Sequence, residues 1–330
     1  MDKNKKILVL FCGGTIVMEE KGDGSLSVPD NKDSAIEMLR NVEPRLSTIA
    51  DYDIEFIANI DSTNLTPEDW DRMLYKIKEK YQQYDGFVIT HGTDTMAYTA
   101  AALNLAISGL GKPVILTGSQ IPASKIETDA RLNLVNAFRV ATIDISGVFI
   151  VFDQRIILGS KATKSSESSL DAFQTVNGED AGEISIDIKI KPWVKKRISE
   201  PHQIEIIPGF EPDIFVYTIT PGCDPSDLEF LLHNEKIKGI IIRAYGTGNI
   251  PYGFENFFKK AKTRKLPVVV TSQCLHGKTL MPLYDVGRKA LELGAIEGHE
   301  QSLENLAVKL MWALRHGPDQ IEKIIIKREE

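Results

Sequence analysis

Residues 90–96, THGTDTM, place three hydroxyl side chains beside one histidine and one carboxylate. The stretch follows the apolar run YDGFVI and precedes AYTAAALNLAI, so it lies where a buried strand ends and a helix begins. Helix capping accounts for one of these side chains, because Thr93 and Asp94 are both good N-cap residues. The remaining hydroxyls indicate a site that works through hydroxyl chemistry.

Similar small polar clusters follow other apolar runs. In order along the chain they contain Gly13, Gly14 and Thr15 in FCGGTI; Asp61, Ser62 and Thr63 in NIDSTN; Thr93 and Asp94; and Ser119 and Gln120 in TGSQIP. Any one cluster is ordinary turn chemistry. Open parallel sheets bind ligands outside the carboxyl ends of their strands, however, so four such ends in succession predict a binding crevice.

The kind of site is narrowed by what these clusters lack. CGGTIV does not have the GxGxxG spacing, and no lysine follows a glycine-rich loop, so nucleotide phosphates are disfavoured. His91 and Asp94 are three apart, but no other metal-ligand cluster sits at a strand end. We therefore expect no metal and no cofactor, and interpret His91 as a structural histidine.

A nucleophilic hydroxyl is the interpretation that remains. Asp94 can hold a cation, and amides at a helix N-terminus can hold a carboxylate. A threonine nucleophile also needs a base, which can be a buried lysine whose pKa is lowered. The segment GSKATKSSESSLDAF offers both Lys161 and Lys164.

The elements that position these residues indicate an α/β fold. Continuous apolar strands (KILVLF, DIEFIANI, GFVIT, PVILTG, GVFIVF) alternate with amphipathic helical stretches, which is typical of a parallel sheet covered on both faces. A second alternating set runs from IFVYTI to GRKALELG. We predict a larger N-terminal domain over residues 1–190, a linker over 191–212 and a smaller C-terminal α/β domain over 213–330.

Composition limits the partners. The 330 residues are 42% hydrophobic and 26% charged, with a net charge of −7, which is ordinary for a soluble globular protein and disfavours nucleic acid. Three cysteines without paired spacing predict neither a disulfide framework nor a zinc site. No apolar run approaches a membrane span, so we expect a cytoplasmic protein that acts on a small molecule, without a membrane partner.

Motifs along nearly the whole chain resemble one family. CGGTI, HGTDTMAY, KPVILTGSQIP, ATK…DAF, IIRAYGTGNIP and VKLMWAL occur in the order seen in the bacterial-type L-asparaginases, and most resemble their cytoplasmic type I branch. This resemblance implies a large N-terminal and a small C-terminal α/β domain, assembled as a homodimer or homotetramer. It also implies cofactor-free hydrolysis of L-asparagine to L-aspartate and ammonia through an acyl-threonine.

The resemblance assigns roles to residues that match the motifs. Thr15 would be the nucleophile, and Thr93, Lys164 and Asp94 a second triad in which Lys164 is the base. Substrate contacts would come from Gly14, Asp61, Ser62, Thr63, Gly92, Ser119 and Glu304. Among these, Ser62 would bind the α-carboxylate and Ser119 approach the leaving amide, while Glu304 would reach the substrate amine across a dimer. Asp94 would also bind the α-ammonium, and backbone amides near Gly14 and Thr93 would stabilise the oxyanion.

One position departs from the family pattern. The loop after the nucleophile normally carries a tyrosine that closes over the substrate, and Ser25 stands there instead. We expect this glycine-containing loop to be mobile and the enzyme to be weakened, unless Tyr245 or Tyr284 from a partner subunit fills the role. Arg243 is either part of an effector site of the type I branch or a salt-bridge residue.

Two other functions remain open. An asparaginase-like subunit of a tRNA-dependent amidotransferase is disfavoured, because such subunits usually carry an extra N-terminal domain and this chain reaches GGTI by residue 15. A catalytically weakened amino-acid sensor would suit the missing tyrosine.

Overall fold

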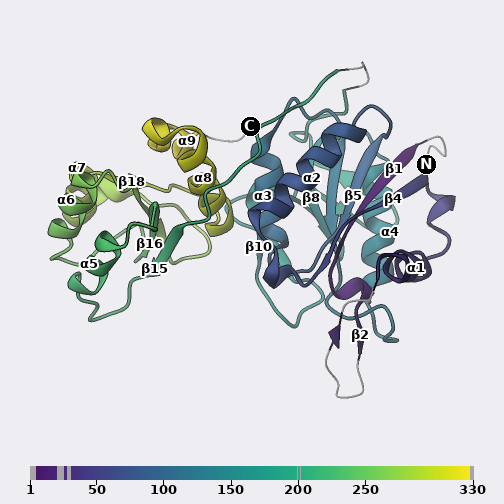
Figure 1. The fold of residues 1–330 in the computed structure, drawn as a ribbon, viewed down its shortest axis with the longest axis horizontal. Coiled ribbons are helices and arrows are strands. Elements are labelled where there is room, and N and C mark those ends of the chain that lie inside the picture. The colour runs from purple at the N-terminus through teal and green to yellow at the C-terminus, as the bar shows by residue number, and fades with distance from the viewer. Residues whose placement is uncertain (1–4, 21–25, 28–30, 199, 201, 328–330) are drawn as a thin grey trace. The chain divides into compact units, whose positions relative to one another are not determined.

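The computed structural model describes residues 5–20, 26–27, 31–198, 200 and 202–327 (Figure 1). The chain folds into two compact units, Met1–Pro208 and Gly209–Glu330. Gly22, Gly24 and Ser25, on which the expectation of a mobile, weakened lid rests, lie outside the described residues. Within the described residues, no helix is long and apolar enough to cross a membrane.

A mixed sheet of eight strands forms the centre of the N-terminal unit, in the order β13-β12-β9-β8-β7-β5-β1-β4. Five neighbouring strands run parallel: β4 (Asp51–Ile60), β1 (Lys6–Gly13), β5 (Gly86–Thr90), β7 (Pro113–Thr117) and β8 (Gly147–Phe152). Every residue of β5 and β7 is buried, as expected for central strands covered on both faces. The predicted α/β class is confirmed.

The order of the parallel strands places a crevice. Across the sheet these strands lie in the order β4-β1-β5-β7-β8. The first strand of the chain, β1, therefore lies between the second, β4, and the third, β5, and the winding direction reverses between β1 and β5. Ligands of such sheets bind at this switch point, outside the carboxyl ends of the strands. The residues after β4, β1, β5 and β7 are the four polar clusters found in the sequence, and these strands are consecutive in the sheet.

The far part of the sheet is antiparallel, which the sequence patterns did not indicate. Strands β9 (Arg155–Leu158), β12 (Gly182–Ile184) and β13 (Ile188–Ile190) extend it beyond β8. A tight hairpin connects β8 to β9, with Phe152 paired to Arg155 and Asp153 at a positive φ of 51°. Aspartate tolerates this conformation better than most residues, so the turn needs no glycine.

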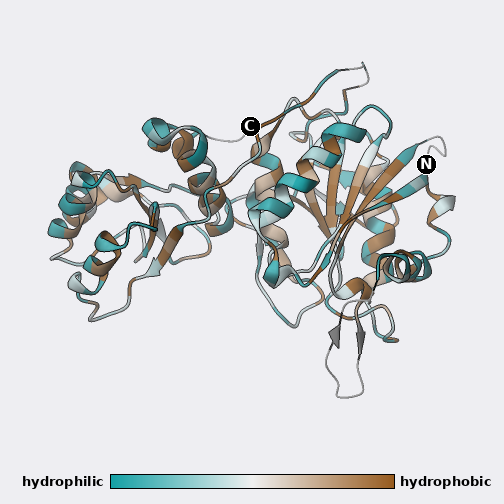
Figure 2. Ribbon diagram, in the orientation of Figure 1, coloured by the Kyte–Doolittle hydropathy of each residue, from teal (hydrophilic) through white to brown (hydrophobic). Residues whose placement is uncertain are grey.

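Helices cover both faces of the sheet (Figure 1). They are α1 (Lys32–Val42) and α4 (Ala130–Ala141) on one face, and α2 (Pro67–Lys80) and α3 (Met96–Ala106) on the other. Figure 2 shows apolar central strands beneath helices whose outer faces are polar. This is the pattern of amphipathic helices packed on a buried sheet.

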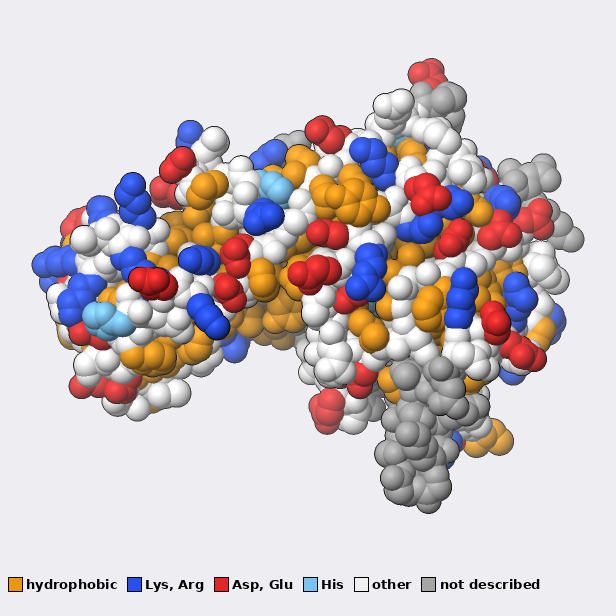
Figure 3. All heavy atoms as spheres, viewed as in Figure 1, with side chains coloured by type: hydrophobic (Ala, Val, Ile, Leu, Met, Phe, Trp, Pro, Cys, Tyr) orange, Lys and Arg blue, Asp and Glu red, His pale blue; other side chains and the backbone are white. Residues whose placement is uncertain are grey.

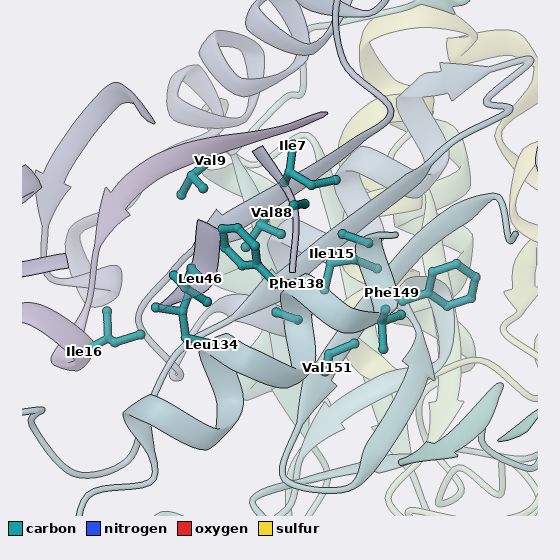
Figure 4. Packing of buried hydrophobic residues seen from close by; sticks show 14 of the residues in the cluster. Ile7, Val9, Ile16, Leu46, Val88, Ile115, Leu134, Phe138, Phe149 and Val151 are labelled. Atoms are coloured by element: carbon teal, nitrogen blue, oxygen red, sulfur yellow. The ribbon is translucent and has the colours of Figure 1, made fainter. Parts of the chain in front are cut away.

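The core beneath α1 and α4 is continuous (Figure 4). Phe138 and Leu134 of α4 pack with Ile7 and Val9 of β1 and with Val88 of β5. Alternate residues of a strand point to opposite faces, so the intervening Leu8 and Leu10, also fully buried, face α2 and α3. β1 is therefore buried on both sides, which fixes the position of Gly13 at its end and of Gly14 after it.

Several short elements complete the N-terminal unit. They are β2 (Glu19–Glu20), β3 (Leu26–Ser27), β6 (Ile107–Ser108), β10 (Ala162–Lys164), β11 (Phe173–Thr175) and β14 (Glu205–Ile206), together with the 3₁₀ turns η1 (Thr15–Val17), η2 (Leu46–Thr48), η3 (Ser62–Asn64) and η4 (Gly159–Lys161). Residues up to Pro208 belong to this unit: the Ile198 amide donates to the Gly111 carbonyl, and the His202 ring lies 3.0 Å from the Tyr81 hydroxyl.

The C-terminal unit contains a parallel sheet of four strands in sequence order, β15 (Ile214–Thr218), β16 (Gly239–Ala244), β17 (Val268–Ser272) and β18 (Ala295–Glu297). Its helices are α5 (Ser226–His233), α6 (Glu255–Thr263), α7 (Asp285–Glu292), α8 (Leu303–His316) and α9 (Ile321–Ile326), with 3₁₀ turns η5 (Met281–Leu283) and η6 (Pro318–Gln320). Phe257 and Phe258 of α6 pack with Ile240 and Ile242 of β16 in a core of its own. The predicted smaller α/β domain is confirmed.

The surface carries both signs of charge. On the face shown in Figure 3, lysine and arginine side chains are interspersed with aspartate and glutamate. The sequence contains 46 acidic and 39 basic residues, so both signs of charge are expected on the surface.

Asn133 of α4 ties the ends of two strands together and should be important for stability. Its buried side chain donates to the Gly118 carbonyl at 3.0 Å and accepts from the Asp153 amide at 2.8 Å. We expect Asn133→Ala to lower the free energy of unfolding by about 2–4 kcal/mol, because it leaves buried backbone groups unpaired. Urea denaturation measures this, and Asn41→Ala at an exposed position of α1 should change stability by less than about 0.5 kcal/mol. Equal effects of the two substitutions would contradict the bridging role.

Candidate active site

A lysine, a threonine and an aspartate meet at the carboxyl end of β5. The Lys164 Nζ lies 2.8 Å from the Thr93 Oγ1 and 2.7 Å from the Asp94 Oδ1. Thr93 is mostly buried, Lys164 has 16% of its side chain exposed and Asp94 has 56%. A lysine in direct contact with a hydroxyl is placed to exchange a proton with it.

Lys164 reaches Thr93 because of a short antiparallel pair. β10 pairs with β11, so that Lys164 lies opposite Phe173, whose ring is buried against Phe152. The neighbouring Lys161 points elsewhere: its Nζ lies 3.3 Å from the Asn177 carbonyl. Of the two lysines in the sequence motif, Lys164 is therefore the one that contacts the threonine.

Gln120 is a site residue that the sequence patterns included but assigned no role. The Thr93 hydroxyl donates to its Oε1 at 3.0 Å, while its Nε2 donates to the carbonyls of Glu167 and Ser169. The carbonyl partners fix which way the amide is turned, so the oxygen faces Thr93. The Thr93 hydroxyl thus donates a hydrogen bond to Gln120 and accepts one from Lys164.

The loop that carries Gln120 is anchored from α4. The backbone amides of Gln120 and Ile121 donate to the Asp129 carboxylate at 3.0–3.1 Å, and Asn133 holds the Gly118 carbonyl. Ser119, expected to approach a leaving amide, is fully buried, and its Oγ has no hydrogen-bond partner among the described residues.

Glycines allow three chain segments to touch at His91–Gly92. A Cβ on Gly14, which has a φ of +95°, would lie 2.6 Å from the Gly92 nitrogen, and one on Gly118 would lie 2.3 Å from the His91 carbonyl oxygen. A Cβ on Gly92 would lie 2.6 Å from the Ser62 Oγ. Real Cβ atoms do not approach this closely, so Gly14, Gly92 and Gly118 can only be glycine where the ends of β1, β5 and β7 meet, and Ser62 after β4 packs against Gly92.

Ser62 is held in this contact by its neighbours. It is buried, and its carbonyl accepts from the Thr95 Oγ1 at 2.8 Å. Asp61 accepts from the Thr63 amide and hydroxyl and so closes the η3 turn. Helix α2 begins instead with a capping box between Thr66 and Asp69, so Ser62 does not cap that helix. Helix α3 is likewise preceded by Thr95, and neither Thr93 nor Asp94 is its N-cap.

Thr15 begins the η1 turn directly after β1. Gly14 precedes it, and the next two side chains, Ile16 and Val17, are buried in the core under α1 and α4. Thr15 itself is partly exposed, and no described residue forms a hydrogen bond with its hydroxyl. The turn is thus anchored on its apolar side by Ile16 and Val17, and Thr15 directly follows Gly14, whose backbone approaches Gly92.

Other residues named from the sequence lie in the C-terminal unit. Glu304 is in the first turn of α8, and Tyr284 precedes α7. Arg243, on β16, donates to the Gln273 carbonyl at 3.5 Å, and its Nε has no hydrogen-bond partner among the described residues. Tyr245 follows β16 and bridges to Asn249 through the backbone. The described residues include no group of three or more potential metal ligands.

His91 is fully buried beside the site, and burial lowers its pKa to about 4. An unfolded chain restores the ordinary pKa of about 6.5, so between these values the unfolded state binds a proton that the folded state does not. The stability conferred by neutral His91 is complete above pH 6.5 and is lost as the pH falls towards 4, by about 3 kcal/mol at most.

Chemical denaturation of the parent and of His91→Gln at a series of pH values tests this. We expect the parent to lose more free energy of unfolding than the variant as the pH is lowered through this window. Parallel pH profiles would contradict the buried neutral histidine.

Comparison with known proteins identifies the family of the chain. Residues 6–195 match the family model described as Asparaginase, N-terminal, and residues 213–325 match that of the Glutaminase/Asparaginase C-terminal domain. The L-asparaginase of Thermococcus kodakarensis is 36% identical over 324 residues, covering 97% of this chain and 96% of that protein. A component of the glutamyl-tRNA(Gln) amidotransferase of Methanosarcina mazei is 34% identical over 329 residues, covering 97% of this chain and 76% of that protein.

The fold is shared as well. The crystal structure of L-asparaginase I from Vibrio cholerae superposes with a TM-score of 0.87 at 31% identity, over 98% of each chain. Two family models that together span most of the sequence, and relatives above 30% identity over nearly its whole length, lead to one conclusion. The chain belongs to the asparaginase family and is an amidohydrolase.

Proposed function

We propose that the protein hydrolyses L-asparagine to L-aspartate and ammonia through a covalent threonine intermediate. The observation that carries the proposal is the Lys164–Thr93–Asp94 cluster at the switch point of an asparaginase-family sheet. A hydroxyl paired with a lysine, and the lysine with a carboxylate, can accept a proton from a reacting group and pass it on, which is the general-base part of covalent catalysis.

In the first half of the reaction, the Thr15 Oγ bonds to the side-chain carbonyl carbon of asparagine. The backbone amides of Gly14 and Thr93 receive the oxyanion; in other enzymes such a donor is worth roughly 2.7–4 kcal/mol. The C–N bond then breaks, the nitrogen takes up the proton of the threonine hydroxyl, and ammonia leaves. The product is an aspartyl ester of Thr15.

In the second half, water attacks the ester. Thr93 accepts the proton of the water and passes its own to the Lys164 amine, whose positive charge Asp94 then stabilises. The ester C–O bond breaks, Lys164 returns its proton through Thr93 to the Thr15 oxygen, and aspartate leaves with the oxygen of the water in its new carboxyl group. Two threonines thus serve two steps, and atoms and charges balance without a cofactor.

The substrate would be held by its charged groups. Ser62, in contact with Gly92 at the crevice, would bind the α-carboxylate between Asp61 and Thr63. Asp94 uses one carboxylate oxygen for Lys164 and has the exposure to offer the other to the α-ammonium. In a homodimer or homotetramer, Glu304 of one protomer would reach the substrate amine in another. We propose a cytoplasmic location on the sequence evidence alone.

Ammonia release with L-asparagine, L-glutamine and their D-isomers tests this function. We expect turnover to be fastest with L-asparagine. Binding of these amino acids without ammonia release would instead support the sensor function. The similarity to an amidotransferase component favours a second candidate, ammonia supply to a transfer-RNA-bound acceptor, and hydrolysis that depends on such a partner would indicate it.

Removal of either threonine hydroxyl should stop catalysis without unfolding the protein. We expect Thr15→Ala and Thr93→Ala each to lower kcat by about a thousandfold or more, and the double variant to be no worse than the slower single one, because the residues act as a unit. Thr48→Ala, which removes an exposed hydroxyl bonded to the Arg45 carbonyl, is the control and should retain parental turnover. Near-parental ammonia release from either active-site variant would disprove the assignment.

The two lysines give a matched pair of substitutions. Lys164→Met removes the group in contact with Thr93 and should lower kcat by about 10²–10⁴-fold, the usual contribution of acid–base catalysis. It should still bind aspartate in calorimetry, because Ser62 and Asp94 remain. Lys161→Met should be near-parental, since its amine bonds to the Asn177 carbonyl instead. The reverse result would exchange the roles of the lysines.

A further inference from the structure

A chain of buried hydrogen bonds runs from α2 to the backbone of the site. The Trp70 Nε1 lies 3.0 Å from the Thr99 Oγ1, which lies 2.8 Å from the His91 Nε2. The His91 Nδ1 lies 2.7 Å from the Gly92 carbonyl oxygen. Trp70 is 5% exposed, and Thr99 and His91 are fully buried, so water does not compete for these contacts.

The direction of every bond in this chain is determined by chemistry. An indole N–H can only donate and a carbonyl can only accept. The Gly92 carbonyl therefore requires a proton on the His91 Nδ1, and a neutral ring then presents a bare Nε2 to Thr99. The Thr99 hydroxyl accepts from Trp70 and donates to this nitrogen. The other tautomer would set the lone pair of Nδ1 against those of the carbonyl oxygen.

The ring is neutral for a physical reason. Burial lowers the pKa of His91 to about 4, well below the pH at which most proteins work. A single tautomer, held at both nitrogens, also fixes the orientation of the ring. The imidazole is thus a rigid spacer between α3 and the turn after β5.

The end of this chain is the peptide that bears Thr93. The Gly92 carbonyl and the Thr93 amide belong to one planar trans peptide and point in opposite directions. Fixing the carbonyl therefore fixes the amide. Among the described residues no group accepts a hydrogen bond from the Thr93 N–H, so it is free to serve a ligand. Gly14 and Ser62 pack closely against Gly92, and this contact restricts movement of the turn.

We propose that His91 is a positioning residue, held by Thr99 and Trp70, that sets the Gly92–Thr93 peptide so that the Thr93 amide and hydroxyl face the substrate. This proposal rests on the proposed function, because it assigns the Thr93 amide to the oxyanion. It also means that Thr99 of α3, which would touch no substrate group, affects the rate of the chemical step through His91. An amide moved out of line stabilises the transition state less and leaves the charged substrate contacts unchanged.

Thr99→Val keeps the shape of the side chain and removes only the hydroxyl. We expect kcat for L-asparagine to fall by about 10- to 100-fold, with KM within about threefold of the parent. Thr99→Ser should recover most of the loss, because it restores the hydroxyl. Thr142→Val, at the end of α4, removes a hydroxyl that bonds to the Arg139 carbonyl and should leave kcat unchanged. A folded Thr99→Val with kcat within twofold of the parent, or a Thr99→Ser as slow as Thr99→Val, would overturn the proposal.

Nitrogen NMR tests the same chain without relying on turnover. In the parent, the His91 Nδ1 should carry the proton and Nε2 should not, and Thr99→Val should shift the backbone amide resonance of Thr93. If Thr99→Val does not fold, Trp70→Phe is used in its place, because it removes the indole N–H that holds Thr99 and keeps the Thr99 hydroxyl. A parent that releases no ammonia would refute the proposed function, and the NMR result alone would then decide whether the chain of hydrogen bonds positions Thr93. An Nε2-protonated parent ring, or an unmoved Thr93 resonance in the variant, would overturn it.

Discussion

The site depends on the close approach of backbone at His91–Gly92. Gly14, Gly92 and Gly118 leave no room for a side chain at the point where the ends of β1, β5 and β7 converge, and Ser62 after β4 touches the same turn. Any larger residue would separate these strand ends and with them the hydroxyls they carry. The parallel strand order, with its reversal between β1 and β5, is what brings the four ends to one edge of the sheet.

Around this contact, the polar groups are held from outside the crevice. Asp129, which precedes α4, and Asn133 of α4 anchor the loop that carries Gln120, and the β10–β11 pair brings Lys164 to Thr93. The proposed catalytic groups thus lie in turns and at the end of the short strand β10, while buried residues of the helices and of the apolar core determine where these segments sit. This division lets the chemistry be exposed to substrate without making it imprecise.

The sequence predicted the elements and the strand ends because apolar runs and turn residues are local signals. It identified both α/β units and the clusters from Thr15 to Ser119. It did not indicate the antiparallel strands after β8, since their short runs look like loop segments, and it assigned Gln120 no role because that contact depends on how a distant loop folds back. Spacing alone also could not distinguish Lys161 from Lys164. The two lysines are three residues apart on a bent segment, so one amine contacts the Asn177 carbonyl and the other contacts the Thr93 hydroxyl.

The central claim is a covalent route in which one threonine is acylated and the other assists water. Acid quenching during turnover of L-asparagine, followed by mass spectrometry of the peptides, tests it most directly. The account predicts an aspartyl adduct on the peptide that contains Thr15, and a larger amount of it in Lys164→Met if that variant still acylates. An adduct on the peptide that contains Thr93, or full turnover with no adduct on either peptide, would contradict the account.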